Sequence, residues 1–300
     1  MPPIPAWLQR KRVTVPIGVT VLTMAAPLVL TQAKEQNLWS PDSAAAKTDS
    51  TLVKPSACPA PDNPDPLLGA RTRKPGRWVG TTPMAKDAPI VVMAGHADSQ
   101  GMNSAGTPGF AVGVKKQAPM DARMRDELYW NLKVQKAVVR QGKARALNIS
   151  AYNPPALTIR NDNHPKTNWS QARVRSAKGE YILEIHFDAY SPYGFGSGLI
   201  PAINRPLNTV DESLGKAFGR FPRLFRGGLG GPRRGIGILE IGMLEPPLEQ
   251  KLRDPNTQLQ TIECLALRVV DALEQGVNRS PDEGGNGPQG SNLQTNPADG

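Results

Sequence analysis

Two of the three histidines in the sequence lie in settings that suit metal binding. His96 directly follows an apolar run over residues 89–95 that ends in glycine, a pattern typical of a buried strand that leads into a loop. In α/β sheets, ligands gather in the loops beyond the carboxyl ends of strands. His186 stands between Glu184 and Asp188, and in a strand these three side chains share one face, where they need water, partners or a metal. The alternative for His96 is a histidine with a structural role in its loop. The alternative for His186 is an edge strand whose polar face is solvated.

Two glutamates could complete a reactive site with these histidines. Glu127 lies in a stretch with helical spacing of apolar residues, with Asn131 one turn further along the same face. The alternative for Glu127 is an ordinary charged side chain on the solvent-exposed face of a helix. Glu240 interrupts the apolar run at 236–241, where burial would raise its pKa and leave an unpartnered carboxylate costly. Such a group is a candidate general base or acid, and the alternative is a buried pair with an arginine.

Strands and helices alternate along the part of the chain that carries these residues. Apolar runs predict strands at residues 89–95, 144–150, 181–189 and 235–243. Helical spacing predicts a helix over 121–141 and a last helix that starts with Asp254 as its N-cap. This order predicts an α/β fold, with a single twisted, mostly parallel sheet and helices on both of its faces.

The flanks differ in composition from this region. Residues 1–33 contain a basic cluster and then an uncharged apolar stretch, which predicts a signal peptide or signal anchor. Residues 34–86 are rich in proline and small polar residues and predict a disordered linker. Residues 278–300 have almost no apolar side chains and predict a disordered tail. The packed domain is therefore expected over residues 87–277, a size typical of one domain.

The net charge and the cysteine content limit the classes of partner and the cellular compartments that are expected for this protein. The formal net charge of +10 favours an anionic partner such as nucleic acid, a phospholipid surface or a cell-wall polymer. The predicted export signal argues against nucleic acid, and membrane contact is expected only through the N-terminal segment if it stays uncleaved. Two cysteines, Cys58 and Cys264, cannot build a disulfide framework, but one bridge is possible outside the cytosol.

The four singled-out residues together resemble the zinc-dependent N-acetylmuramoyl-L-alanine amidases of peptidoglycan. The segment "IVVMAGH" is similar to that family's first-strand motif and implies that His96 is a zinc ligand. "ELYWNL" resembles the motif of the second ligand, which implies Glu127, and "EIHFDA" that of the third, which implies His186. "ILEIGMLEPPLE" looks like a variant of the motif with the catalytic glutamate, which implies Glu240.

The motifs also depart from the family pattern. Met93 stands where that family has an acidic residue, and Asp98 replaces a glycine after the first histidine. Met243 replaces a phenylalanine and Glu245 an asparagine in the last motif. These changes keep a second hypothesis open, in which the chain is a catalytically silent amidase-like module for wall binding or regulation.

The expected chemistry is hydrolysis. Two imidazoles and one carboxylate fill three of the four positions that Zn²⁺ prefers and leave one for water, whose pKa the metal lowers. Glu240 would take the proton from this water and pass it to the departing amine. Asp188, Arg233 and Arg234 are the candidates for substrate contact, since guanidinium groups suit the carboxylates of a stem peptide.

We therefore predict an exported zinc amidase of the periplasm or cell exterior. It would cut the amide between N-acetylmuramic acid and L-alanine in peptidoglycan. A zinc hydrolase of another amide is a further alternative. The sequence leaves open whether the signal is cleaved, whether a protein activator controls the site and whether the cysteines pair.

Overall fold

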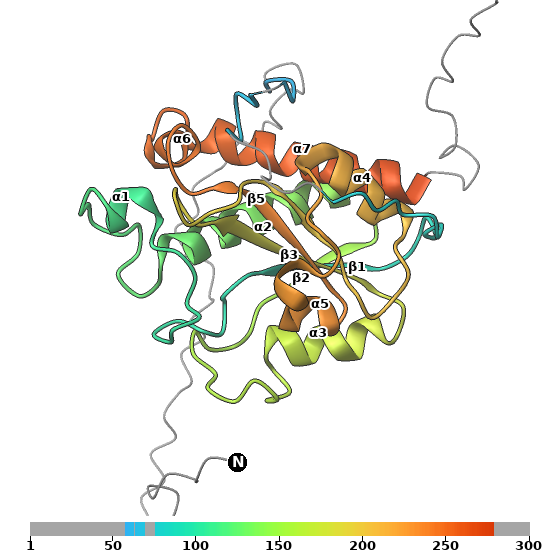
Figure 1. Cartoon of the computed structure of the whole chain (residues 1–300). Coiled ribbons are helices and arrows are strands. Elements are labelled where there is room, and N and C mark those ends of the chain that lie inside the picture. The colour runs from blue at the N-terminus through green and yellow to red at the C-terminus, as the bar shows by residue number, and fades with distance from the viewer. Residues whose placement is uncertain (1–57, 63, 70–75, 279–300) are drawn as a thin grey trace, which may run out of the picture. The chain divides into compact units, whose positions relative to one another are not determined.

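A computed structural model of the chain describes residues 58–62, 64–69 and 76–278 (Figure 1). The predicted signal segment over residues 1–33, most of the predicted linker and nearly all of the predicted tail lie outside these ranges. Within the ranges, no helix combines the length and the apolar character that crossing a membrane requires.

A five-stranded sheet forms the centre of the described region. Its strands run in the order β2 (Ile149–Tyr152), β1 (Ile90–Ala94), β3 (Tyr181–Asp188), β5 (Ile236–Met243) and β4 (Gly198–Ile200). The first four are parallel, and the edge strand β4 pairs with β5 in the antiparallel direction. The predicted α/β class with a mostly parallel sheet is confirmed.

Helices cover both faces of the sheet, as the near-continuous apolar sequences of the central strands require. Figure 1 shows on one side the helices α2 (Asp126–Ala144), α4 (Thr209–Phe218), α6 (Leu248–Arg253) and α7 (Gln258–Asn278). The other side carries α3 (Asn168–Ser176) and α5 (Gly230–Arg233). A short helix α1 (Gly109–Gly113) and a turn of 3₁₀ helix (Phe225–Gly227) belong to the connecting loops.

The alternation predicted for β3 is confirmed, and it assigns the reactive side chains to one face. Tyr181, Leu183, Ile185 and Phe187 join the large core under α2, α4 and α7. Ile182 joins the smaller core on the opposite face, under α3 and α5. Because side chains alternate along a strand, Glu184 and His186 share this second face.

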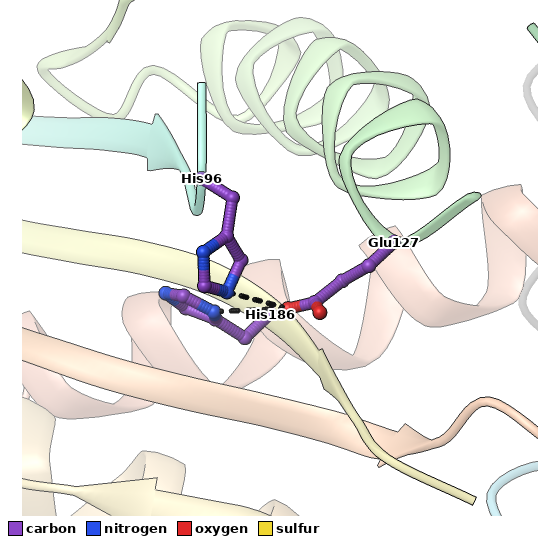
Figure 2. A group of neighbouring side chains, drawn as sticks. All are labelled: His96, Glu127 and His186. Atoms are coloured by element: carbon purple, nitrogen blue, oxygen red, sulfur yellow. Dashed lines mark hydrogen bonds and ion pairs between the residues drawn. The ribbon is translucent and has the colours of Figure 1, made fainter. Parts of the chain in front are cut away.

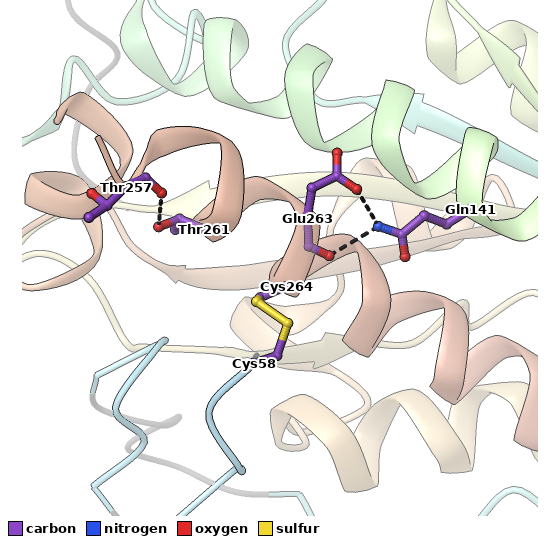
Figure 3. Close-up of a disulfide and its surroundings, with 6 residues drawn as sticks. All are labelled: Cys58, Gln141, Thr257, Thr261, Glu263 and Cys264. Atoms are coloured by element: carbon purple, nitrogen blue, oxygen red, sulfur yellow. Dashed lines mark hydrogen bonds between the residues drawn. A yellow bond between two sulfur atoms is a disulfide. The ribbon is translucent and has the colours of Figure 1, made fainter. Parts of the chain in front are cut away.

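The chain before β1 is tied to α7 by a covalent and an ionic contact. Cys58 and Cys264 form a disulfide, which decides a pairing that the sequence left open (Figure 3). Asp65 forms an ion pair with Arg268 of α7, and Leu67 and Leu68 are buried in the large core. This part of the predicted linker therefore packs against the domain.

Two predicted helix starts are wrong, each for a local reason. The helix expected from residue 121 begins at Asp126, because the Asp121 carboxylate accepts the backbone N–H of Arg123 and closes a turn instead. Asp254 was expected to cap the last helix, but α7 begins at Gln258. The Asp254 side chain accepts the N–H of Asn256, which again closes a turn and separates α6 from α7.

Candidate metal centre

Three side chains from separate elements converge at the carboxyl ends of β1 and β3. His96 lies in the loop just after β1, His186 is near the end of β3, and Glu127 is the second residue of α2 (Figure 2). The Nε2 atom of His96 lies 3.2 Å from Glu127 Oε1, and the Nδ1 atom of His186 lies 3.1 Å from the same oxygen. The nearest donor atoms of the three residues all lie within 4.8 Å of one another.

The backbone conformation at the end of β1 allows the imidazole rings of His96 and His186 to contact each other. His96 has a φ of 63°, in the left-handed region that few non-glycine residues adopt. The ring of His186 occupies the space where a side chain at position 95 would lie, so only glycine fits there. The two rings meet edge to face, with centroids 4.7 Å apart.

The outer nitrogen of each imidazole has an acceptor of its own. Nδ1 of His96 donates to the carbonyl oxygen of Ser104 at 2.6 Å, so its lone pair is on Nε2, which faces Glu127. Nε2 of His186 lies 3.2 Å from Glu184 Oε2, so Nδ1 is the atom left to face Glu127. Metal-binding histidines typically have such a second partner, which selects the tautomer and orients the ring.

Glu127 is held in place from both ends of its carboxylate. Its Oε2 accepts the backbone N–H of Thr107 at 2.6 Å, which leaves Oε1 turned toward the histidines. Asn131, one turn along α2, donates to the carbonyl oxygen of Gly95 at 3.1 Å and ties the helix to the end of β1. Burial alone would raise the pKa of Glu127, but the two histidines outweigh it and lower this pKa well below its usual range.

The electrostatics of the cluster suit a cation. Burial would lower the pKa of His186, but hydrogen bonds to Glu127 and Glu184 outweigh it and raise this pKa well above its usual value. The two carboxylates therefore favour a positive charge between them. Two imidazole nitrogens and a carboxylate oxygen form the donor set of hydrolytic zinc sites, and the residues present fit Zn²⁺.

Glu240 stands beside this donor set on β5. It is the register partner of His186, so the two side chains leave neighbouring strands on the same face. The pairing register shifts just beyond this pair, at a bulge of the kind that often re-aims side chains beside active sites. The carboxylate of Glu240 thus lies next to the metal-binding groups.

The environment of Glu240 suits a proton acceptor. Its Oε2 atom is buried and has no hydrogen-bond partner, and no ion pair within the described ranges includes it. Burial, reinforced by Asp188, Glu127 and Glu184 against the opposing effect of His186, raises the pKa of Glu240 to about 8. The alternative of a buried pair with an arginine is therefore not what the structure shows.

A cavity of about 260 Å³ adjoins the candidate metal centre. His96 and His186 form part of its wall, together with Glu184, Asn168 and Trp169. The wall also carries Asp98 and Asp162 but no lysine or arginine. A substrate in this cavity would lie directly beside the two imidazoles.

The three residues predicted to contact substrate lie outside the wall of this cavity. Asp188 accepts three backbone N–H groups, from Ala189, Phe195 and Gly196, and thereby shapes the loop after β3. Arg233 donates to the carbonyl oxygens of residues 227 and 228. Arg234 stacks over Trp169 with its guanidinium carbon 4.3 Å from the ring centroid, so it is the one that borders a wall residue.

Sequence reasoning missed several groups that support the centre. Ser104 and Thr107 act through backbone atoms, which leave no trace in residue type. Asn168 begins α3, a helix that no apolar spacing predicted. Glu184 did have a signal, its position two residues before His186 on the same strand face, but its partner could not be inferred.

Of three comparisons with known proteins, only the one with solved structures found proteins similar to this chain. No family model matches it, and no curated protein does. The chain is similar to solved N-acetylmuramoyl-L-alanine amidases. One is the catalytic domain of CwlV from Bacillus (Paenibacillus) polymyxa var. colistinus, with 16% identity and a TM-score of 0.40 over 62% of this chain and 99% of that chain.

Two further structures show a likeness of the same extent. The apo form of Ami1 from Mycobacterium abscessus is 15% identical, with a TM-score of 0.39 over 62% of this chain and 99% of its own. The catalytic domain of the CD27L endolysin, which targets Clostridia difficile, is 15% identical, with a TM-score of 0.41 over 62% of this chain and 96% of its own. Function must therefore be argued from the side chains of this chain.

Proposed function

We propose that the protein is a zinc-dependent amidase that hydrolyses the amide between N-acetylmuramic acid and L-alanine in peptidoglycan. The observation that carries the proposal is the pairing of two features at one edge of the sheet. His96, Glu127 and His186 direct two imidazole nitrogens and one carboxylate oxygen at a common point. Beside them, Glu240 holds a buried carboxylate oxygen without a partner.

Each residue has a definite task in the proposed reaction. His96, Glu127 and His186 would hold the metal, and their second partners keep the donor atoms aimed at it. Zinc, when bound, supplies Lewis acidity, which makes water more acidic and polarises a carbonyl group. Glu240 accepts the proton of the attacking water on its carboxylate and then donates it to the nitrogen of the departing amine.

The protonation behaviour of Glu240 suits this exchange. A general base works best when its pKa lies near the working pH, because it must both take up and release the proton. A pKa of about 8 in the metal-free protein meets this condition, and a nearby cation would lower it towards neutrality. A surface glutamate with an ordinary pKa would be a weaker proton acceptor.

Peptidoglycan as the substrate is supported by the sequence motifs and by charge. The net charge of +10 favours contact with an anionic polymer outside the cavity, since the cavity wall carries acidic but no basic side chains. The Cys58–Cys264 disulfide supports an exported protein, since such bonds persist in oxidising compartments. We place the protein in the periplasm or outside the cell.

Metal analysis combined with digestion of purified sacculi tests the proposal. The wild type is expected to contain about one zinc per chain and to release peptides that begin with L-alanine, identified by mass spectrometry. Glu240→Ala is expected to keep the zinc and lose the release. A Glu180→Gln variant serves as the control and should digest normally, because Glu180 lies just before the start of β3, at the end away from His186.

Four outcomes would contradict the proposal. A wild type that digests sacculi equally well after complete zinc removal would exclude the metal. Undiminished digestion by Glu240→Ala would exclude the assigned base. Zinc without any release of peptide would favour the silent binding module, and release of a different fragment would favour another amide.

A further inference from the structure

Glu184 is a buried carboxylate that the proposed reaction does not use. It lies on β3 two residues before His186, and only 4% of its surface is exposed. Its Oε2 faces Nε2 of His186 at 3.2 Å, and its Oε1 accepts the side-chain amide of Asn168 at 2.8 Å. Its one ion-pair contact within the described ranges is this histidine.

Asn168 is fixed by three hydrogen bonds of its own. Its Nδ2 donates to the carbonyl oxygen of Ala94 at 2.8 Å as well as to Glu184. Its backbone N–H donates to Asp98 Oδ2 at 2.8 Å. Its Oδ1 is buried without a partner, so the amide is oriented entirely by what its nitrogen atoms donate.

These contacts form one continuous network between the two histidine-bearing segments. It runs from His186 through Glu184 and Asn168 to Asp98, which lies two residues after His96 in the loop beyond β1. The bond to Ala94 anchors the same amide to the end of β1. The ring of His186 and the loop of His96 are thus held to a common frame.

We propose that Glu184, held by Asn168, is a positioning residue that keeps His186 in the tautomer whose Nδ1 faces the metal. The inference rests on the proposed metal site. An imidazole whose Nε2–H is held by a carboxylate must bind a cation through Nδ1, and the carboxylate also makes that nitrogen a stronger donor. Glu184 acts on the metal only through His186.

Alternative roles for Glu184 fit the contacts less well. It is not a fourth ligand, because both of its oxygens already accept hydrogen bonds and it lies at Nε2 of His186, whereas Glu127 lies at Nδ1 of the same ring. It is not a structural ion pair of the ordinary kind, because no lysine or arginine within the described ranges pairs with it. The positioning role accounts for both of its bonds.

Zinc affinity, measured by competition with a chromophoric chelator, tests the inference. Loss of a second partner of a metal-binding histidine typically weakens metal binding 10- to 100-fold, and we expect a loss of about this size for Glu184→Ala. Glu184→Gln keeps an acceptor oxygen and should recover part of the loss. Glu263→Gln is the matched control, since it also neutralises a buried carboxylate, but one that pairs with Arg140 far from the cluster.

The protonation state of His186 gives a readout that a general loss of stability would not change. In zinc-loaded protein with ¹⁵N-labelled histidine, the wild type should show His186 protonated on Nε2 alone. In Glu184→Ala we expect a mixture of tautomers. Circular dichroism checks that each variant is folded, and if Glu184→Ala is not, Glu184→Gln and Asn168→Ala carry the same test.

The outcomes separate this inference from the function on which it rests. Wild-type zinc affinity and an unchanged His186 tautomer in Glu184→Ala would overturn the positioning role and leave the metal site intact. Loss of affinity of equal size in Glu263→Gln would also overturn it, by showing a nonspecific effect. A wild type that binds no zinc would overturn both.

Discussion

The raised pKa of Glu240 predicts a measurable dependence of stability on pH in the metal-free protein. The group binds its proton more tightly in the folded state, where its pKa is about 8, than in the unfolded state, where it is 4.5. Folding is therefore favoured by protonation, and this contribution is fully present below pH 4.5. It is lost as the pH rises toward 8.

The size of the effect follows from the same values. A rise in pKa from 4.5 to about 8 corresponds to about 5 kcal/mol, at about 1.4 kcal/mol for each pH unit. Glu240 is partly exposed as a residue although its Oε2 is buried, so solvent screens part of this energy. We expect the wild type to lose about 2–4 kcal/mol relative to Glu240→Gln between pH 5 and pH 8.

Urea unfolding of both proteins at pH 5 and pH 8, with a chelator present, measures this difference. Groups with shifted pKa values elsewhere contribute nearly equally to both proteins and cancel in the comparison. Glu180→Gln, whose carboxylate lies in an ion pair with Arg175, should not reproduce the effect. If the difference in unfolding free energy between wild type and Glu240→Gln is the same at both pH values, the assigned environment of Glu240 is wrong.

Three other perturbations test the covalent frame and the metal centre. Cys58→Ser removes a disulfide between residues 206 positions apart, and the loss of this constraint on the unfolded chain corresponds to about 5 kcal/mol of stability. The denaturant midpoint of the variant should therefore fall strongly and match that of the reduced wild type. Gly106→Ala places a methyl group 2.5 Å from Glu127 Oε2 and 2.8 Å from the ring of His96, so zinc affinity should fall at least about 10-fold. Gly101→Ala has a similar positive φ but open space around it, and equal zinc loss in both variants would refute the steric argument. The pKa of His186 is raised, and its Nδ1 must lose a proton to bind metal, so zinc affinity should fall steadily as the pH is lowered from 8 to 6. A zinc affinity that does not change over this pH range would argue against His186 as a ligand.

Sequence periodicity predicted the central elements of the fold because their signals are local. The alternation in β3 gave the face that carries His186, and the apolar runs located β1 and β5. The edge strand β4 was missed, because three residues that begin with glycine make no periodic pattern. Helix α4 was also missed, although Asn208 and Asp211 cap it with a reciprocal pair of hydrogen bonds and its apolar residues Val210, Leu214 and Phe218 recur every four positions, because the helix is only ten residues long.

The candidate site was predictable only in its residue types. His96, Glu127 and His186 follow from sequence because each lies at or near the end of a strand or helix with a recognisable pattern, and Glu240 follows because it interrupts the apolar run of β5. Their partners are not predictable in this way, because Ser104 and Thr107 contribute backbone atoms and Asn168 meets Glu184 only through the packing of α3 on β3. The same holds for Cys58 and Cys264, whose pairing depends on how the chain before β1 crosses α7.

The absence of a side chain at position 95 has a consequence for the substitutions that the chain can tolerate. Because the imidazole of residue 186 fills the volume that a side chain at position 95 would need, Gly95 can be replaced only if residue 186 becomes smaller as well. In a saturation library selected for zinc retention, every replacement of Gly95 should therefore be depleted as severely as replacement of a ligand. Gly95 would then score as essential, although it offers the ion no atom at all.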